Sequence, residues 1–73
     1  MKKYFISHTY GKEHEDNINL YYKIQEYGKC LKSRWSGDYI VGTYEYNNKN
    51  YELWYNAELG VSSEVIEYAK EEL

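Results

Sequence analysis

Proline is absent from this chain of 73 residues, and cysteine, methionine, phenylalanine and arginine occur once each. The single Cys30 excludes an internal disulfide, and no cluster of cysteine and histidine residues offers a structural metal site. A free thiol is typical of a reducing compartment, so we expect a cytoplasmic protein. No run approaches the roughly 18–20 apolar residues of a membrane span. The charged start, Met1 to Lys3, lacks the apolar stretch that follows it in a signal peptide.

Motifs for catalysis are also missing. The five glycines are scattered and form no phosphate-binding loop, and no Gly-x-Ser-x-Gly sequence occurs. Cys30 falls beside the apolar stripe of a predicted helix, where a buried and inert thiol is expected. His8 alternates with strand residues, and the acidic neighbours of His14 cannot easily converge on one metal ion. We therefore predict no enzyme, no cofactor, and no catalytic or metal-binding residue.

Tyrosine is abundant, with eleven copies, and aromatic residues make up 19% of the chain. An apolar fraction of 42% is too high for intrinsic disorder, and the length predicts one small domain over residues 1–73. Lysine, asparagine, tyrosine and isoleucine together fill 30 of the 73 positions. A/T-rich codons encode these four residues, which indicates a bacterium with an A/T-rich genome, or one of its phages, as the source.

Charge is divided unevenly along the chain. Residues 1–36 carry a formal charge of +3 and residues 37–73 carry −6. Such asymmetry can mark a surface for a charged partner, or the two halves can interleave on folding and neutralise each other. Both interpretations stay open at this point.

Hydrophobic periodicity predicts an α+β fold in the order β-α-β-β-α. Leu20, Ile24, Tyr27 and Leu31 form one apolar stripe of the first predicted helix, and Ser62 is a natural cap for the second. We expect a three-stranded, mostly antiparallel sheet with two helices packed on one face. The predicted elements are a strand at 3–10, a helix at 13–32, a loop at 33–38, strands at 39–46 and 51–57, and a helix at 63–73.

The two central strands predict a hairpin, because an asparagine-rich turn separates them. With Asn48-Lys49 as the two-residue loop, Tyr46 faces Tyr51 and Glu45 faces Glu52. One side of the hairpin is then apolar, and the other is an aromatic patch with an acidic rim, a composition favoured at protein interfaces. Alternatively, Trp54 belongs to a core, and the like charges protect a sheet edge from aggregation. The candidate partner-binding residues are Tyr39, Glu45, Glu52, Trp54, Asn56 and Glu58.

These features predict a non-enzymatic protein-binding module that covers a basic surface of its partner, and a nucleic-acid-handling host protein is the candidate partner. Small, acidic proteins of this composition are similar in type to accessory proteins of phages and mobile elements, which often inhibit host enzymes or defence systems, as anti-CRISPR proteins do. The alternative is a small nucleic-acid-binding protein that uses Lys23, Lys29 and Lys32 on the first helix. A homodimer that covers its own aromatic face is a third hypothesis.

Overall fold

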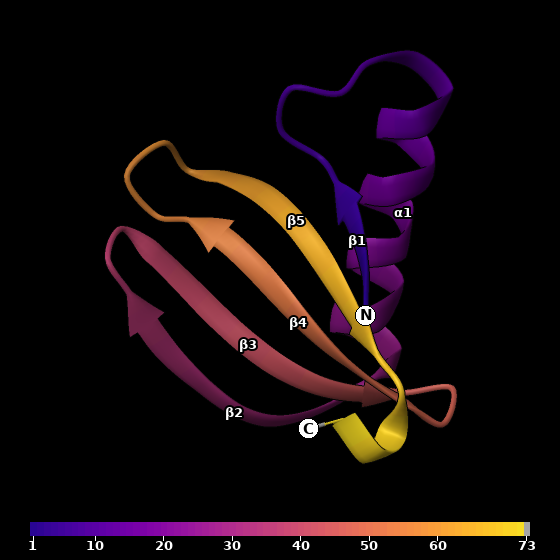
Figure 1. Cartoon of the computed structure of the whole chain (residues 1–73). Helices are drawn as coiled ribbons and strands as arrows, with labels where there is room; N and C mark the ends of the chain where they lie inside the picture. Colours follow the sequence, from indigo (N-terminus) through magenta and orange to yellow (C-terminus); the bar gives the residue numbers. More distant parts are fainter. Residues whose placement is uncertain (73) are drawn as a thin grey trace.

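The computed structural model describes residues 1–72 and contains one α-helix and five strands (Figure 1). A short 3₁₀-helix, η1, follows the last strand. The elements in chain order are β1 (Lys2–Phe5), α1 (Gly11–Tyr27), β2 (Lys29–Ser36), β3 (Tyr39–Tyr46), β4 (Lys49–Asn56), β5 (Val61–Tyr68) and η1 (Lys70–Glu72).

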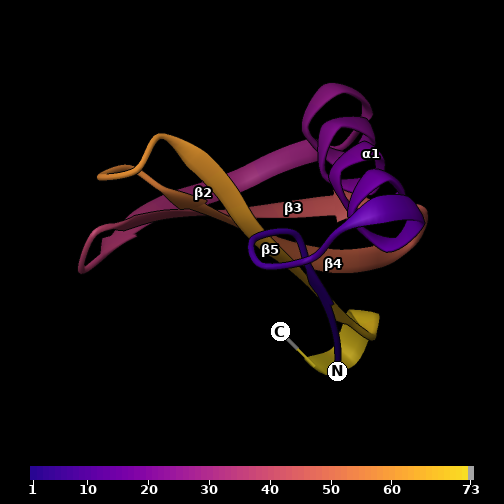
Figure 2. The ribbon, with the colours of Figure 1, turned by 90° about the horizontal axis from the view of Figure 1, so that it is seen from above.

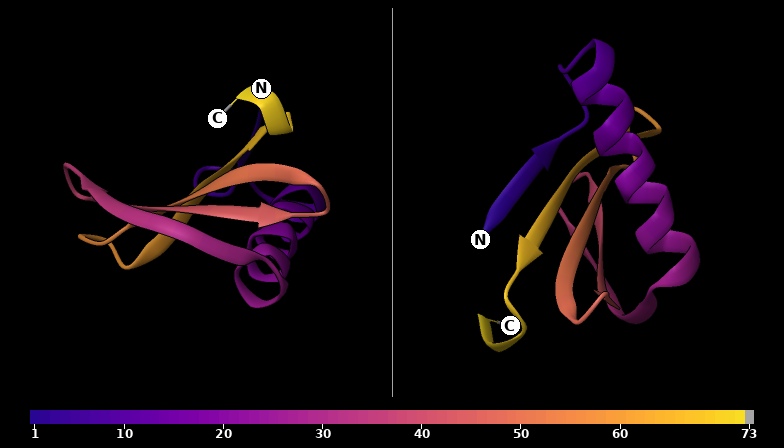
Figure 3. Two further views of the ribbon diagram at one scale, coloured as in Figure 1. Left: turned by 90° about the horizontal axis from the view of Figure 1, so that it is seen from below. Right: turned by 90° about the vertical axis from the view of Figure 1, so that its right-hand side faces the viewer.

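All five strands form one antiparallel sheet in the order β1-β5-β4-β3-β2. The chain leaves β1 at one edge, crosses one side of the sheet as α1, and re-enters at the opposite edge as β2 (Figure 3). The α+β class is confirmed. The prediction of three strands with two helices is wrong, because 29–36 and 61–68 are strands.

Gly28 ends the helix five residues earlier than the periodicity predicts. A Cβ atom at this position would lie 2.5 Å from the carbonyl oxygen of Ile24 and 3.2 Å from that of Glu45. Only glycine lets the chain turn so tightly from α1 into β2 beside the end of β3. The loop predicted at 33–38 is therefore mostly strand, and Leu31 lies in β2 and not on the helix.

The second predicted helix is replaced by β5, which pairs with β1 on one side and β4 on the other. Its alternation puts Val65 among the residues facing α1 and Ile66 on the other side, and both are buried. Valine and isoleucine favour a pleated strand that has neighbours on both sides. The sequence permits a helix here, but two-sided pairing stabilises the strand.

The β3–β4 hairpin confirms the predicted turn region and corrects its register. Asn47 and Asn48 both have left-handed backbones, with φ of 49° and 63°, as a two-residue type I′ turn requires. Tyr46 therefore pairs with Lys49, and Glu45 pairs with Asn50. The shift is two residues, so each side chain stays on its predicted face. The predicted Glu45–Glu52 repulsion is absent, because Glu52 pairs with Thr43.

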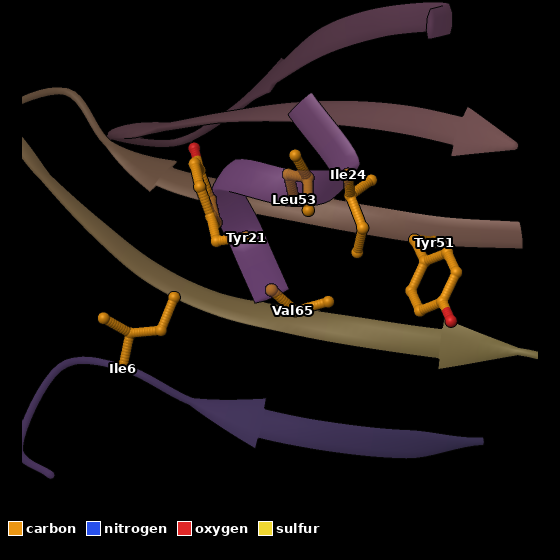
Figure 4. Packing of buried hydrophobic residues seen from close by; sticks show 6 residues of the cluster. All are labelled: Ile6, Tyr21, Ile24, Tyr51, Leu53 and Val65. Atoms are coloured by element: carbon orange, nitrogen blue, oxygen red, sulfur yellow. The ribbon is translucent and has the colours of Figure 1, made fainter. Parts of the chain in front are cut away.

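The main core lies between α1 and the sheet. Tyr21 and Ile24 from α1 pack against the sheet residues, and Tyr27 from the predicted stripe is exposed. The view in Figure 4 shows residues from α1, from β4 and β5, and from the segment after β1 around one centre. The buried cluster consists of Ile6, Tyr21, Ile24, Tyr51, Leu53 and Val65.

Candidate functional site

The side of the sheet opposite α1 carries most of the predicted partner-binding residues. We call this side the open face. On β3 and β4, alternation from the core residue Leu53 assigns Tyr39 and Trp54 to it. Five of the six predicted site residues lie there, namely Tyr39, Glu45, Glu52, Trp54 and Asn56. Glu58 lies in the exposed turn between β4 and β5.

Glu52 is held by three neighbours on the open face. Its carboxylate accepts hydrogen bonds from Trp54 Nε1 at 3.3 Å and the Tyr68 hydroxyl at 3.1 Å, and Arg34 Nη2 lies at 3.5 Å. Burial, followed by the hydrogen bond to Glu52, raises the pKa of Tyr68. Glu52 is therefore held in place by partners within the fold, and its charge is compensated by Arg34.

The side chains of Arg34 and Trp54 together cover part of β3 on the open face. The guanidinium of Arg34 lies 5.7 Å from the Trp54 ring centroid, within the range of a cation–π interaction. Val41 stands between them in the register, since it pairs with both, and it is fully buried. Trp54 is half-buried and covers a small second core. It remains partly accessible beside Tyr39, whose ring packs edge-on against it at 5.5 Å.

Glu45 lies at the other end of the hairpin from Tyr39 and Asn56. Its carboxylate forms an ion pair with Lys70 Nζ at 3.1 Å. The structure thus separates the predicted acidic rim. Glu45 and Glu52 each pair with a cation of the same chain, and the ion pair of Glu52 supports the interpretation that unlike charges of the two halves neutralise each other.

The remaining predicted residues gather where two turns meet. The Ala57 amide donates to the Asp38 carbonyl at 2.9 Å, which fixes the β4–β5 turn against the β2–β3 turn. Asn56 Oδ1 accepts the Leu59 amide at 3.0 Å and closes the second turn. We call this region, residues 37–39 with 54–60, the turn end. Figure 2 shows both turns at the end of the sheet that points away from α1.

The turn end is exposed and carries both acidic and apolar side chains. Leu59 keeps 70% of its surface exposed, and Asp38 and Glu58 are also exposed. Within residues 1–72, neither carboxylate forms an ion pair. These two acids of the turn end therefore remain available to a partner.

Two further residues of the open face were missed by the sequence reasoning. Glu64 of β5 pairs with Phe5 of β1 on one side and with Trp54 of β4 on the other. Glu64 lines a hollow of about 520 Å³. The sequence prediction placed Glu64 on a helix, so no pattern linked it to Phe5 or Trp54. The hollow is lined by Phe5, Ser7, His8, Thr9, Tyr39, Ser63 and Glu64.

The lysines of the nucleic-acid alternative do not share a helix. Lys23 lies on α1, whereas Lys29 and Lys32 lie on β2. The β2–β3 register puts Lys29, Lys32 and Arg34 on the open face, because they pair with Glu45, Thr43 and Val41. The basic surface is therefore an edge strand and not a helix face.

The two histidines and the cysteine, which were weighed as catalytic or metal-binding residues, lie at structural or isolated positions. His14 Nδ1 lies 2.8 Å from the carbonyl oxygen of Ile6, so this nitrogen carries the proton and fixes the segment after β1. His8 lies in a turn with φ of 63° and not in a strand. Cys30 is exposed on β2, so the prediction of a buried helix thiol is wrong.

Neither a metal cluster nor a membrane span is found in the described part of the chain. Residues 1–72 contain no group of three or more histidine, cysteine or acidic side chains that could hold a metal ion. Their only α-helix is neither long enough nor apolar enough to cross a membrane.

Comparisons with known proteins found nothing similar. No family model, no curated protein and no solved structure matches the chain.

Proposed function

We propose that the protein is a non-enzymatic binding module that attaches to a protein partner through the turn end and the adjoining open face. The observation that carries the proposal is the Tyr39–Trp54 aromatic pair beside acids without ion-pair partners in residues 1–72. Aromatic side chains dominate binding energy at protein interfaces, and an acidic rim selects a basic partner.

The turn end is well suited to binding because its backbone is already fixed. Hydrogen bonds join its two turns and close the second one. The hydrogen bond from Trp54 Nε1 to the Glu52 carboxylate helps to hold the indole ring in place. A preformed surface loses little conformational entropy on binding, so a modest area can give useful affinity.

The biological role we propose is inhibition by occlusion. The module covers a basic surface of a host enzyme or defence system, such as a nucleic-acid channel, in the manner of small phage or mobile-element proteins. The exposed free thiol of Cys30 fits action in the reducing cytoplasm. The net charge of −3 favours association with a basic surface.

Capture of partners from host lysate tests this proposal. Tagged protein is compared with the charge-reversed E58K/E64K variant and with E13K/E15K, which makes the same charge change on α1. We expect a stoichiometric protein partner that survives nuclease, dissociates with salt, and is lost with E58K/E64K only. Equal capture by both variants would show that the turn end and the adjoining open face are not the binding surface.

A second candidate, nucleic-acid binding, is favoured by the three cations on the open face of β2. Lys29, Lys32 and Arg34 follow one another along β2, with Arg34 over the Trp54 ring. A nucleic acid could track these charges while a base stacks on an aromatic ring. Fluorescence anisotropy with a random single-stranded oligonucleotide tests this function. Removing two phosphate contacts in K29A/K32A should reduce the slope of log affinity against log salt by about 1.4.

A further inference from the structure

We propose that the hollow over Glu64 binds an arginine side chain of the partner, with Glu64 as the counter-charge and Phe5 and Tyr39 as its aromatic walls. This inference rests on the proposed function, because it names the chemistry by which the open face recognises a basic protein. It assigns a role to Glu64 and Phe5, which the sequence reasoning did not connect.

The register brings the carboxylate and the rings together. Phe5, Glu64 and Trp54 lie directly across from one another on β1, β5 and β4. Adjacent strands are about 4.8 Å apart, so these three side chains rise side by side from one face. Phe5 keeps 51% of its surface exposed, which leaves its ring accessible to a ligand.

The wall of the hollow beyond Phe5 is fixed by hydrogen bonds. Thr9 Oγ1 donates to the carbonyl oxygen of Ile6 at 2.7 Å, and Asn17 Nδ2 donates to that of Phe5 at 2.7 Å. The Ser7 amide donates to the Ser63 carbonyl at 3.0 Å, which ties the wall to β5. The hollow of about 520 Å³ is thus largely preformed, as binding sites usually are.

Glu64 differs from the other glutamates of the sheet in its charge balance. Glu45, Glu52 and Glu67 each have a cationic partner within 3.5 Å. Within residues 1–72, the half-buried Glu64 carboxylate has neither an ion pair nor a side-chain hydrogen bond. A cation that enters the hollow therefore finds an uncompensated carboxylate.

The open face already contains one arginine site built from its own residues. Arg34 lies over the Trp54 ring and beside the Glu52 carboxylate. The hollow repeats this combination of one carboxylate with aromatic rings but supplies no arginine. A guanidinium suits such a site better than an ammonium, because it is planar, stacks on rings and pairs with a carboxylate through two hydrogen bonds.

The test is an NMR titration of the whole protein with N-acetyl-arginine amide, which requires no partner. N-acetyl-citrulline amide has nearly the same shape without the charge, and N-acetyl-lysine amide has the charge without the planar group. We expect saturable shifts at Phe5, Glu64 and Tyr39 in the order arginine, lysine, citrulline. Glu64→Gln should weaken arginine binding at least about tenfold, and Glu58→Gln should leave it unchanged.

Several outcomes overturn the assignment. These are no saturable shift with arginine, equal binding of citrulline, or equal binding by the E64Q variant. Shifts of the hollow residues that depend on protein concentration alone would show that a second copy covers it. Near-ultraviolet circular dichroism of both variants confirms that they are folded.

The two proposals can fail separately. If E64Q loses arginine binding and wild-type protein captures no partner from lysate, the hollow is a cation site and the proposed function is wrong. If wild-type protein captures a basic partner but binds no arginine, the proposed function stands and the assignment of the hollow as an arginine site is wrong.

Discussion

At the residue scale, Glu67 links three side chains on the helix side of the sheet. It accepts hydrogen bonds from the Tyr4 hydroxyl at 3.1 Å, the Tyr51 hydroxyl at 3.3 Å and Lys49 Nζ at 3.1 Å. Burial alone would raise the pKa of Glu67, but these hydrogen bonds and the Lys49 charge outweigh burial and lower it. Two tyrosine hydroxyls that would otherwise lack partners are thereby satisfied.

Replacing Glu67 with glutamine should weaken the response of stability to acid. A carboxyl with a lowered folded pKa stabilises above its ordinary value of 4.5, and this contribution is lost as pH falls through the folded value. Urea unfolding should show E67Q less stable at neutral pH by about 1–2 kcal/mol and less sensitive to acid than wild type. Glu15→Gln on α1 is the control, and equal acid sensitivity of E67Q and wild type would contradict the assignment.

Tyr51 should limit stability in alkali. Burial, with the charge of Glu67 and the hydrogen bond to it, raises the Tyr51 pKa from 10.0 to about 12. A raised folded pKa stabilises fully below pH 10, and this stabilisation is lost as pH rises towards 12. Tyr51→Phe should therefore lose less stability than wild type across this range, measured by urea unfolding. Tyr10→Phe, at an exposed position, should behave as wild type does.

At the element scale, Gly28 decides where α1 stops and β2 starts. Gly28→Ala puts a Cβ against two backbone carbonyl oxygens, which cannot rotate away as a side chain could. We expect a loss of about 1–3 kcal/mol in the free energy of unfolding, the usual effect of overpacking. The control is Glu26→Ala on the exposed side of α1. A neutral or stabilising G28A would mean that the junction can relax.

At the scale of the whole molecule, the two sheet edges differ. β1 has only four residues, and its Phe5 carbonyl is occupied by Asn17 Nδ2. β2 has eight residues, nearly all exposed, and carries Lys29, Lys32 and Arg34 with a bulge between Cys30 and Lys32. Positive charge and a bulge both oppose pairing of one β2 with another.

Removing the charge from this edge should promote self-association. In K29T/K32T, two copies can pair through β2 without opposing their lysines, so size-exclusion chromatography with light scattering should detect dimers. K12T/K23T makes the same charge change on α1 and should not dimerise. If both variants stay monomeric, the bulge alone protects the edge.

The candidate site could be predicted only in part. The alternation along β3 and β4 assigned Tyr39, Trp54 and Asn56 to one face, and a register error of two residues did not alter that. It was harder to predict which acidic side chains are free to contact a partner, because their ion-pair partners lie far along the chain. Glu52 pairs with Arg34 and accepts a hydrogen bond from Tyr68, and Glu45 pairs with Lys70. Glu64 was assigned to a helix.

The sequence by itself determined the α+β class, the position of α1 over most of its length, the hairpin and its two faces. These depend on local periodicity and on asparagine tolerating a left-handed backbone. Only the tertiary structure decided that residues 29–36 and 61–68 are strands. Each of these segments has a pattern compatible with another structure, and pairing with partners far along the chain settles the choice. The same pairing decides which carboxylates are neutralised inside the molecule and which face outward.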